Sequence, residues 1–360
     1  MKRVLVAPLD WGLGHATRCI PIIQELQHQQ CEVVLAGSGG SLNLLRAEFP
    51  ALLSFELSGY NPVYPASGSM VWSMAGQLLK FKKVIHREHQ ELEQIVQEQH
   101  IDLVISDNRY GCWSSQVPSI FITHQSNILM PKRFGWLAPI VRALNIRLMA
   151  KFSSCWIPDR QDEQSLAGKL NLFRAVKIPC PVEFIGSLTR FKPSPFAEKK
   201  YDVVAVFSGP EPQRSIVDTL VTRQLQESGL HYRIVRGIPP QTTNMNMTAE
   251  SSQEVNFLIG KQLQEVLEQA HIVIARSGYS TIMDLAALKS KAIFIPTPGQ
   301  TEQEYLAKRL KEKGIAFFMS QHEFDLRKAL EEAKHYSGFM MENDGGNFLR
   351  AAIEKFVKPK

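Results

Sequence analysis

Two groups of residues have the types and spacing to do chemistry, one suited to binding an anion and one to moving a proton. The first begins where the β-branched run 272–275 meets Arg276, Ser277 and Gly278. A tight turn that leads from a strand into a helix presents the first amide groups of the helix and its positive dipole end, which together receive a phosphate. Arg276 and Ser277 would add side-chain donors.

Asp284 lies six residues after Gly278, about two turns into the expected helix. Its two carboxylate oxygens could accept hydrogen bonds from the vicinal hydroxyls of a ribose. Beside a phosphate site, such a carboxylate predicts a nucleotide as ligand. The structural alternative is a plain strand-turn-helix in which Ser277 caps the helix and Asp284 lies on a solvated face.

A second loop follows the next β-branched run, 292–295, and contains two prolines that stiffen it. Gln303 and Glu304 stand at the start of the helix behind this loop, where they could bind the hydroxyls of a sugar. The same stretch also fits a capping box with Thr301 as the N-cap residue. Both roles can hold at once.

Ser208, Gly209 and Arg214 follow the first strand expected in the second half. They could contact a diphosphate, although two prolines in the loop remove amide donors. The alternative is a structural turn. Backbone groups near Ile259 are the expected contacts of the base of the nucleotide.

His15 is the candidate for moving a proton. It follows a loop that starts at Asp10 and contains Gly12 and Gly14, whose small size allows close backbone approach. The N-terminus of a helix lowers the pKa of a histidine, which keeps the ring neutral and available as a general base. Asp10 is an alternative base, and a merely capping His15 is the structural alternative.

Other polar residues follow two further strands expected in the first half. Asp107 comes directly after the run 101–106, and His124 and Asn127 come after 119–123. Ligands of doubly wound sheets lie beyond the carboxyl ends of the strands, so these residues are expected to line an acceptor site near His15. The sequence has no Asp-x-Asp metal motif, and we expect neither a metal nor another cofactor.

Short β-branched runs alternate with longer helical segments, which predicts two doubly wound α/β domains. The predicted strands are 3–7, 32–36, 52–57, 101–106, 119–123 and 155–157, then 202–207, 232–236, 255–258, 272–275, 292–295 and 316–319. The predicted helices include 16–29 and 77–99, then 213–227, 261–270, 281–288, 302–313 and 324–333. A proline-stiffened linker at 191–200 separates a domain over 1–190 from a domain over 201–360, whose last helix could pack back on the first. The ligand site is expected between the domains.

Composition narrows the class of protein. The chain has 360 residues, a net charge of +6 and five cysteines scattered singly, so neither a disulfide framework nor a zinc site is indicated. Without an apolar run of 18 residues or a signal peptide, a cytoplasmic location is expected. The positive charge favours anionic partners, but no nucleic-acid-binding motif is present, so nucleic acid is not an expected partner.

Two segments combine apolar and basic residues in a way that suits a helix lying on a membrane surface, 131–152 and 70–83. They predict peripheral contact with an anionic membrane, at the inner membrane face. The alternative is that both are core-facing helices with solvated basic residues.

The stretch Arg276-Ser277-Gly278, followed by Asp284 and by Pro-Thr-Pro-Gly-Gln-Thr-Glu-Gln-Glu-Tyr at 296–305, resembles the donor-binding signature of GT-B glycosyltransferases. It is similar to the bacterial family that adds N-acetylglucosamine to the lipid-linked muramyl-peptide precursor of peptidoglycan. The resemblance implies two Rossmann-like doubly wound parallel-sheet domains facing across a cleft. It also implies that Asp284 binds the ribose, that the Ser-Gly turn faces the diphosphate, and that Gln303 and Glu304 contact the donor sugar.

The resemblance extends to Gly14-His15, where the family ends its first loop with Gly-His, and to 123–127, which is similar to the family's acceptor loop. It implies a metal-independent, inverting transferase that moves a sugar from a UDP-sugar, such as UDP-N-acetylglucosamine, to an unknown and possibly lipid-linked acceptor. Gln125 replaces an acid of that loop, Glu304 replaces a second glutamine, and Gly299 stands where a histidine is common. The alternatives are a UDP-sugar hydrolase or epimerase on the same fold, and a non-catalytic protein that binds nucleotide-sugars or nucleic acid.

Overall fold

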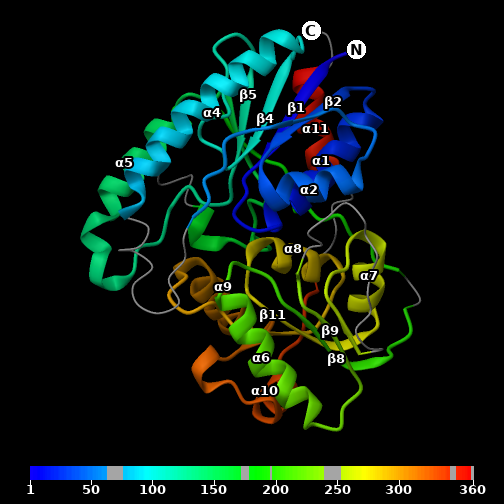
Figure 1. Cartoon of the computed structure of the whole chain (residues 1–360). Helices are drawn as coiled ribbons and strands as arrows, with labels where there is room; N and C mark the ends of the chain where they lie inside the picture. The colour runs from blue at the N-terminus through cyan, green and yellow to red at the C-terminus, as the bar shows by residue number, and fades with distance from the viewer. Residues whose placement is uncertain (63–75, 172–177, 195–196, 239–252, 341–345, 358–360) are drawn as a thin grey trace. The chain divides into compact units, whose positions relative to one another are not determined.

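The computed structural model describes residues 1–62, 76–171, 178–194, 197–238, 253–340 and 346–357 (Figure 1). The chain divides into two compact units. The described residues of the first unit lie within 1–62, 76–188 and 346–357, and those of the second lie within 189–340. Each unit is an α/β structure with its own parallel sheet.

The first unit contains a seven-stranded sheet in the order β3-β2-β1-β4-β5-β6-β7, with every neighbouring pair parallel. The strands are β1 (Arg3–Pro8), β2 (Glu32–Gly37), β3 (Ser54–Glu56), β4 (Leu103–Asp107), β5 (Ser119–Ile122), β6 (Ser154–Ile157) and β7 (Val182–Phe184). The strand order reverses between β1 and β4. Doubly wound sheets bind ligands at such a switch point, beyond the carboxyl ends of the strands.

The helices of the first unit are α1 (Gly14–His28), α2 (Gly39–Glu48), α4 (Leu78–Glu98), α5 (Ala138–Met149) and α11 (Asn347–Val357), with 3-10 turns η1 (Lys132–Leu137) and η2 (Gly168–Asn171). Leu92 and Val96 of α4 pack on the buried side chains of β1, β2 and β4. The last helix, α11, packs against α1 (Figure 1), where Arg350 Nε lies 3.2 Å from Glu25 Oε1. The C-terminal helix therefore belongs to the first unit.

The second unit repeats this design with a six-stranded parallel sheet in the order β10-β9-β8-β11-β12-β13. Its strands are β8 (Tyr201–Val206), β9 (Tyr232–Val235), β10 (Glu254–Val255), β11 (Ala270–Ala275), β12 (Ala292–Phe294) and β13 (Phe317–Phe318). Its helices are α6 (Gln213–Gln226), α7 (Gly260–Glu268), α8 (Tyr279–Ala287), α9 (Thr301–Glu312) and α10 (Leu326–Ala333), with a 3-10 turn η3 (Gln321–Glu323). The switch point lies between β8 and β11.

The prediction of two doubly wound parallel sheets is confirmed, and every predicted strand corresponds to a strand of the structure. β7 and α2 were not predicted. The described residues of the segment expected to be a linker bind the second unit: the Ser194 amide donates to Glu268 of α7 over 2.6 Å, and Lys199 Nζ donates to the Ala270 carbonyl over 2.8 Å. Among the helices that the structure describes, none is long and apolar enough to cross a membrane.

Candidate functional site

The switch point of the first unit holds His15, the second residue of α1. His15 Nδ1 lies 3.0 Å from Asp107 Oδ1 and 2.9 Å from Arg18 Nη2. A protonated Nδ1 would donate to Asp107, whereas an unprotonated Nδ1 would accept from Arg18. Only the first tautomer leaves a lone pair on Nε2, which is what a general base requires.

Arg18 and Asp107 form a buried ion pair at the C-terminal end of β4. Arg18 donates to the Asp107 carboxylate through both Nε and Nη2, and both side chains are almost fully buried. Burial raises the pKa of Asp107, but Arg18 and His15 outweigh burial and bring the pKa to about 2. Asp107 is therefore ionised at neutral pH.

His15 is neutral at the same pH. Burial lowers its pKa, and the Arg18 cation lowers it further, while Asp107 opposes the change. The side chain keeps 15% of its surface exposed. A neutral, partly exposed imidazole held at Nδ1 by an ionised carboxylate has the arrangement of a general base.

His124 completes this group, which we call the histidine cluster: His15, Arg18, Asp107 and His124. His124 follows β5, is buried, and places Nδ1 3.1 Å from Arg18 Nη1. Arg18 was not predicted as a site residue. Its spacing of three residues from His15 on one helix face was the available signal, because residues three apart on a helix are neighbours.

Two of the predicted site residues, Asp10 and Asp107, bind neighbouring groups of the first unit and have structural roles. Asp10 Oδ1 accepts from the Ser41 amide over 3.2 Å, in the first turn of α2. A carboxylate is stabilised at a helix N-terminus, so Asp10 caps α2. Asp107 is fully buried behind Arg18 and His15, so it positions these side chains and does not line the surface that an acceptor would reach.

The remaining acceptor-side residues are distributed around the same loops. Gly12 has a φ of +89°, which favours glycine, and Gly14 is the first residue of α1. Asn127 accepts from Arg142 Nη2 over 3.1 Å and donates to the Lys169 carbonyl over 3.3 Å. These hydrogen bonds hold Asn127 against α5 and η2.

In the second unit, α8 begins after Gly278 at the end of β11, as the sequence predicts. A Cβ atom built on Gly278 would meet only Thr281 Oγ1, at 3.9 Å. The backbone at Gly278 therefore has space on the side where a side chain would lie. The first-turn amides and dipole end of α8 suit a phosphate group.

Arg276 has a different place from the one expected. It is 1% exposed, and its guanidinium donates to the carbonyls of Ile295, Pro296 and Gln213 and to Gln321 Oε1, over 2.6 to 3.1 Å. Burial lowers its pKa to about 10. The side chain ties the loops after β11 and β12 to α6 and η3, so it is not oriented to neutralise a leaving group.

Ser277 and Gln303 also hold the loops together. Ser277 Oγ donates to the Gln303 carbonyl over 2.8 Å, and Gln303 Oε1 accepts from the Thr297 amide over 2.8 Å. Glu304 is exposed and accepts from the Gly299 amide over 2.9 Å. The N-cap of α9 is Gln300, so the expected capping box with Thr301 as N-cap is wrong.

Asp284 is half-buried on α8, where its Oδ1 accepts from Thr189 Oγ1 over 2.8 Å. Burial raises its pKa to about 6, against the lowering effects of Arg190 and of the Thr189 hydrogen bond. An Asp with so high a pKa lies in a poorly solvated position, which is common where a carboxylate binds a ligand.

The loop between β8 and α6 differs from the expected phosphate loop. Glu211 accepts from the Ser215 amide over 3.2 Å and pairs with Arg214, so a carboxylate already occupies the N-terminus of α6. Arg214 also donates to the Arg236 carbonyl over 3.0 Å. The Arg214 guanidinium is therefore bonded to residues of its own unit, whereas Ser208 and Gly209 are exposed.

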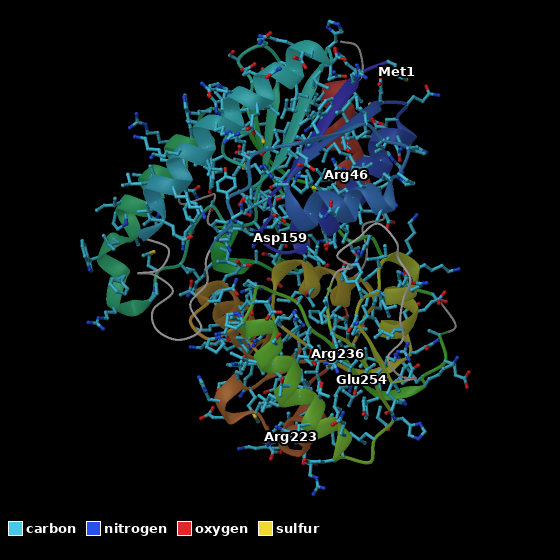
Figure 2. The ribbon with its side chains drawn as sticks, viewed as in Figure 1. Met1, Arg46, Asp159, Arg223, Arg236 and Glu254 are labelled. Atoms are coloured by element: carbon cyan, nitrogen blue, oxygen red, sulfur yellow. The ribbon has the colours of Figure 1, made fainter. Side chains whose placement is uncertain are left out.

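Beside this loop, Arg236 links α6 to β10 (Figure 2). It donates to both Asp218 oxygens, over 2.8 and 2.9 Å, and pairs with Glu254, which Figure 2 shows beside it. Ile259 is the N-cap residue of α7 and is half-buried. Within the described ranges, no cluster of three or more His, Cys, Asp or Glu side chains could hold a metal ion.

Comparison with known proteins defines the class. Residues 203–355 match the family model of the glycosyltransferase family 28 C-terminal domain. An uncharacterised glycosyltransferase of Methanosarcina acetivorans is 23% identical, with 99% of each chain covered. The UDP-N-acetylglucosamine--N-acetylmuramyl-(pentapeptide) pyrophosphoryl-undecaprenol N-acetylglucosamine transferase of Histophilus somni is 38% identical over 92 residues, which cover 25% of each chain.

Solved structures have the same fold. The MurG protein of Acinetobacter baumannii matches with a TM-score of 0.57 at 13% identity, covering 99% of this chain and all of that one. The calicheamicin glycosyltransferase CalG4 matches with a TM-score of 0.61 at 12% identity over the whole of both chains. The chain is therefore a glycosyltransferase with the GT-B fold. It resembles the MurG-type transferases, as its donor-site motif predicted.

Proposed function

We propose that this glycosyltransferase moves a sugar from a UDP-sugar, such as UDP-N-acetylglucosamine, to a hydroxyl group of its acceptor, with inversion at the sugar carbon. The observation that carries the proposal is the strand-turn-helix at Gly278, where a Cβ atom would have space at the start of α8, with the Asp284 carboxylate on the same helix. A helix N-terminus can bind a phosphate group, and a carboxylate on the same helix can bind the hydroxyls of a ribose, so α8 suits a nucleoside diphosphate.

On the donor side, the α8 amides would bind the diphosphate and Asp284 the ribose hydroxyls. Exposed Ser208 and Gly209 are within the loop that follows the neighbouring strand, β8, and could add contacts to the diphosphate. Backbone groups near Ile259 would bind the base, and Glu304 would contact the donor sugar. Arg276, Ser277 and Gln303 act as positioning residues, since their recorded hydrogen bonds fix the two loops.

In the reaction, His15 Nε2 removes the proton of the acceptor hydroxyl as the oxygen attacks the anomeric carbon. The bond from that carbon to the phosphate oxygen breaks, and UDP leaves with the electron pair. Asp107 stabilises the imidazolium that forms. The dipole and amides of α8 would stabilise the charge that develops on the diphosphate, and we propose that no metal ion is required.

The proposed donor and reaction are tested without an acceptor. UDP should raise the melting temperature more than GDP or dTDP, with EDTA present throughout, because a ligand that binds only the native state stabilises that state.

Incubation with UDP-sugars and EDTA, without acceptor, should release neither free sugar nor an epimer. Rapid release of free sugar would instead establish a hydrolase, an epimer would establish an epimerase, and a strict need for a divalent ion would contradict the metal-independent mechanism.

We also propose that the acceptor is presented at a membrane surface, as for a lipid-linked acceptor. Trp136, Ile140 and Leu144 are exposed by 72, 62 and 52%. Ile140 and Leu144 lie four residues apart on one side of α5, and Trp136 lies in η1, which leads directly into α5. Exposed Arg133 and Arg147 lie on the same two elements. Apolar side chains beside basic ones suit an anionic interface.

The membrane proposal predicts salt-sensitive binding to phosphatidylglycerol vesicles in a flotation assay. Trp136→Ser with Ile140→Ser should reduce binding at least tenfold, since each buried apolar side chain contributes about 1.5 to 3 kcal/mol. Phosphatidylcholine vesicles provide the uncharged control. Absence of binding to anionic vesicles at low salt would remove this part of the proposal.

A further inference from the structure

A second buried ion pair of the first unit joins α4 to the turn that follows β4. Arg109 Nε donates to Glu88 Oε1, and neither side chain has exposed surface. Glu88 Oε2 also accepts from the Gly111 amide over 2.9 Å and from the Tyr60 hydroxyl over 2.8 Å. A Cβ atom built on Gly111 would lie 2.5 Å from both Glu88 Oε2 and the Ile85 carbonyl oxygen, so the close approach of α4 requires a glycine there. We call Glu88 and Arg109 the α4 ion pair.

The rest of the Arg109 guanidinium binds groups at the ends of three other strands. Nη1 donates to the Pro8 carbonyl at the end of β1 and to Ser38 Oγ after β2, over 3.2 Å in each case. Nη2 donates to the Ser58 carbonyl after β3 over 2.8 Å. A planar guanidinium presents its donors in fixed directions. Arg109 therefore fixes the start of the loops after β1, β2 and β3 relative to the turn after β4.

That turn also holds the candidate base. Asp107, two residues before Arg109, lies 3.0 Å from His15 Nδ1 through its Oδ1 atom. Pro8 and Asp107 are opposite each other in the pairing of β1 with β4, and the Leu9 amide donates to the Asp107 carbonyl over 2.9 Å. The loop that leads to His15 therefore begins with two hydrogen bonds to the turn after β4, and Arg109 makes one of them.

Stability of the fold does not explain the α4 ion pair. Removing two charges from water costs free energy that their attraction roughly offsets, so apolar side chains of similar size often stabilise a core as well or better. What apolar side chains cannot supply is directed hydrogen bonds. A general base needs such direction, because the His15 ring must keep Nδ1 on Asp107 if Nε2 is to stay unprotonated.

We infer that the α4 ion pair positions the general base: it holds the loop after β1 against the turn after β4, so that Asp107 keeps His15 in the tautomer with an unprotonated Nε2. Glu88 and Arg109 are then positioning residues, which act through Asp107 and do not touch the substrate. The inference rests on the proposed function, because it takes His15 as the base.

The inference is tested by long-range proton–nitrogen correlation NMR on the full chain with nitrogen-labelled histidine, which shows which nitrogen of each neutral ring carries the proton. The chain has 10 histidines, and His15 is assigned by the loss of its signals in His15→Ala. At pH 8 the Nδ1-protonated tautomer of His15 should exceed the other by about tenfold or more, because a hydrogen bond to a charged carboxylate favours it.

The double variant Glu88→Met with Arg109→Met removes both charges and keeps apolar bulk. The tautomer ratio of His15 should fall at least about threefold in this variant, because the loop after β1 loses its bond to Arg109 and the contact with Asp107 loosens. Arg109→Lys keeps a cation beside Glu88 but cannot reproduce the directed bonds of the guanidinium, so the ratio should fall in the same direction by less. If the double variant does not fold, Arg109→Lys alone gives the test.

Tyr60→Phe is the matched control. It removes a buried hydrogen bond to Glu88 but none of the bonds that Arg109 makes to the strand ends, so the tautomer ratio of His15 should be unchanged. Near-ultraviolet circular dichroism and UDP binding report whether each variant is folded.

Two results would overturn the inference and leave the proposed function standing: the tautomer ratio is unchanged in both Arg109 variants, or Tyr60→Phe changes it as much as they do. The second result would assign the effect to a general loosening of the core. If Nε2 is already protonated in the unmodified protein, the proposed role of His15 fails, and the inference fails with it.

Discussion

Replacement of His15 by alanine is expected to lower kcat for sugar transfer by about two to four orders of magnitude, the usual contribution of a general base. UDP affinity should stay within about twofold, because His15 lies in the first unit and the proposed nucleotide contacts lie in the second. His28→Ala is the matched control, since His28 is an exposed histidine at the last turn of the same helix. Full activity in the His15 variant would move the role of base to another group.

The pH profile separates a base from a merely structural histidine. Since burial and Arg18 lower the pKa of His15, the acidic limb of kcat, measured with both substrates saturating, should lie below pH 6.5, and activity should be lost as the pH falls through it. Asp107 raises the pKa of His15, so Asp107→Asn should move that limb to lower pH while reducing kcat. If the acidic limb lies at the same pH in Asp107→Asn as in the unmodified protein, His15 and Asp107 do not carry out the proton transfer.

The fold was largely predictable because the central strands are short buried runs between polar segments. The core of β1, for example, is fully buried and reads as Val-Leu-Val-Ala. β7 was missed because its three residues are only half-buried and follow a proline, so they lack the apolar signal of a central strand. α2 was missed because it begins with Gly39 and Gly40, which disfavour helices, while its cap, Asp10, is distant in sequence.

The candidate site was predictable in its loops but not in its side-chain partners. The turn at Gly278 and the position of His15 follow from local sequence. The pairing of Arg18 with Asp107 joins residues 89 apart, and only the order of the strands brings them together. In the same way, Arg276 reads as a phosphate ligand beside a Ser-Gly turn, but the carbonyls that it binds belong to distant loops.

The second large effect is expected from Asp284→Ala, which should weaken UDP binding by about 1 to 3 kcal/mol, through the loss of charge-assisted hydrogen bonds to the ribose. This corresponds to a dissociation constant about five to 150 times higher. Thr189→Val is the matched control: it removes the hydrogen bond from Thr189 to Asp284 but keeps the carboxylate, so UDP should bind it with nearly unchanged affinity.

The same carboxylate predicts a pH effect on donor binding. The pKa of Asp284 is raised to about 6, so the affinity for UDP-N-acetylglucosamine should fall as the pH falls through 6 and the carboxylate gains a proton. The intact nucleotide-sugar is the suitable ligand, because it lacks a terminal phosphate that titrates in this range. Asp284→Asn should bind more weakly at pH 8 and show little change between pH 5 and pH 8.

Calorimetric titration of UDP into the unmodified protein, Asp284→Ala and Thr189→Val, in EDTA at pH 8, measures most directly whether α8 holds the nucleotide. We predict tight binding to the first and third proteins and at least fivefold weaker binding to the second. Equal affinity for all three, with each variant folded, would contradict a nucleotide site on this helix.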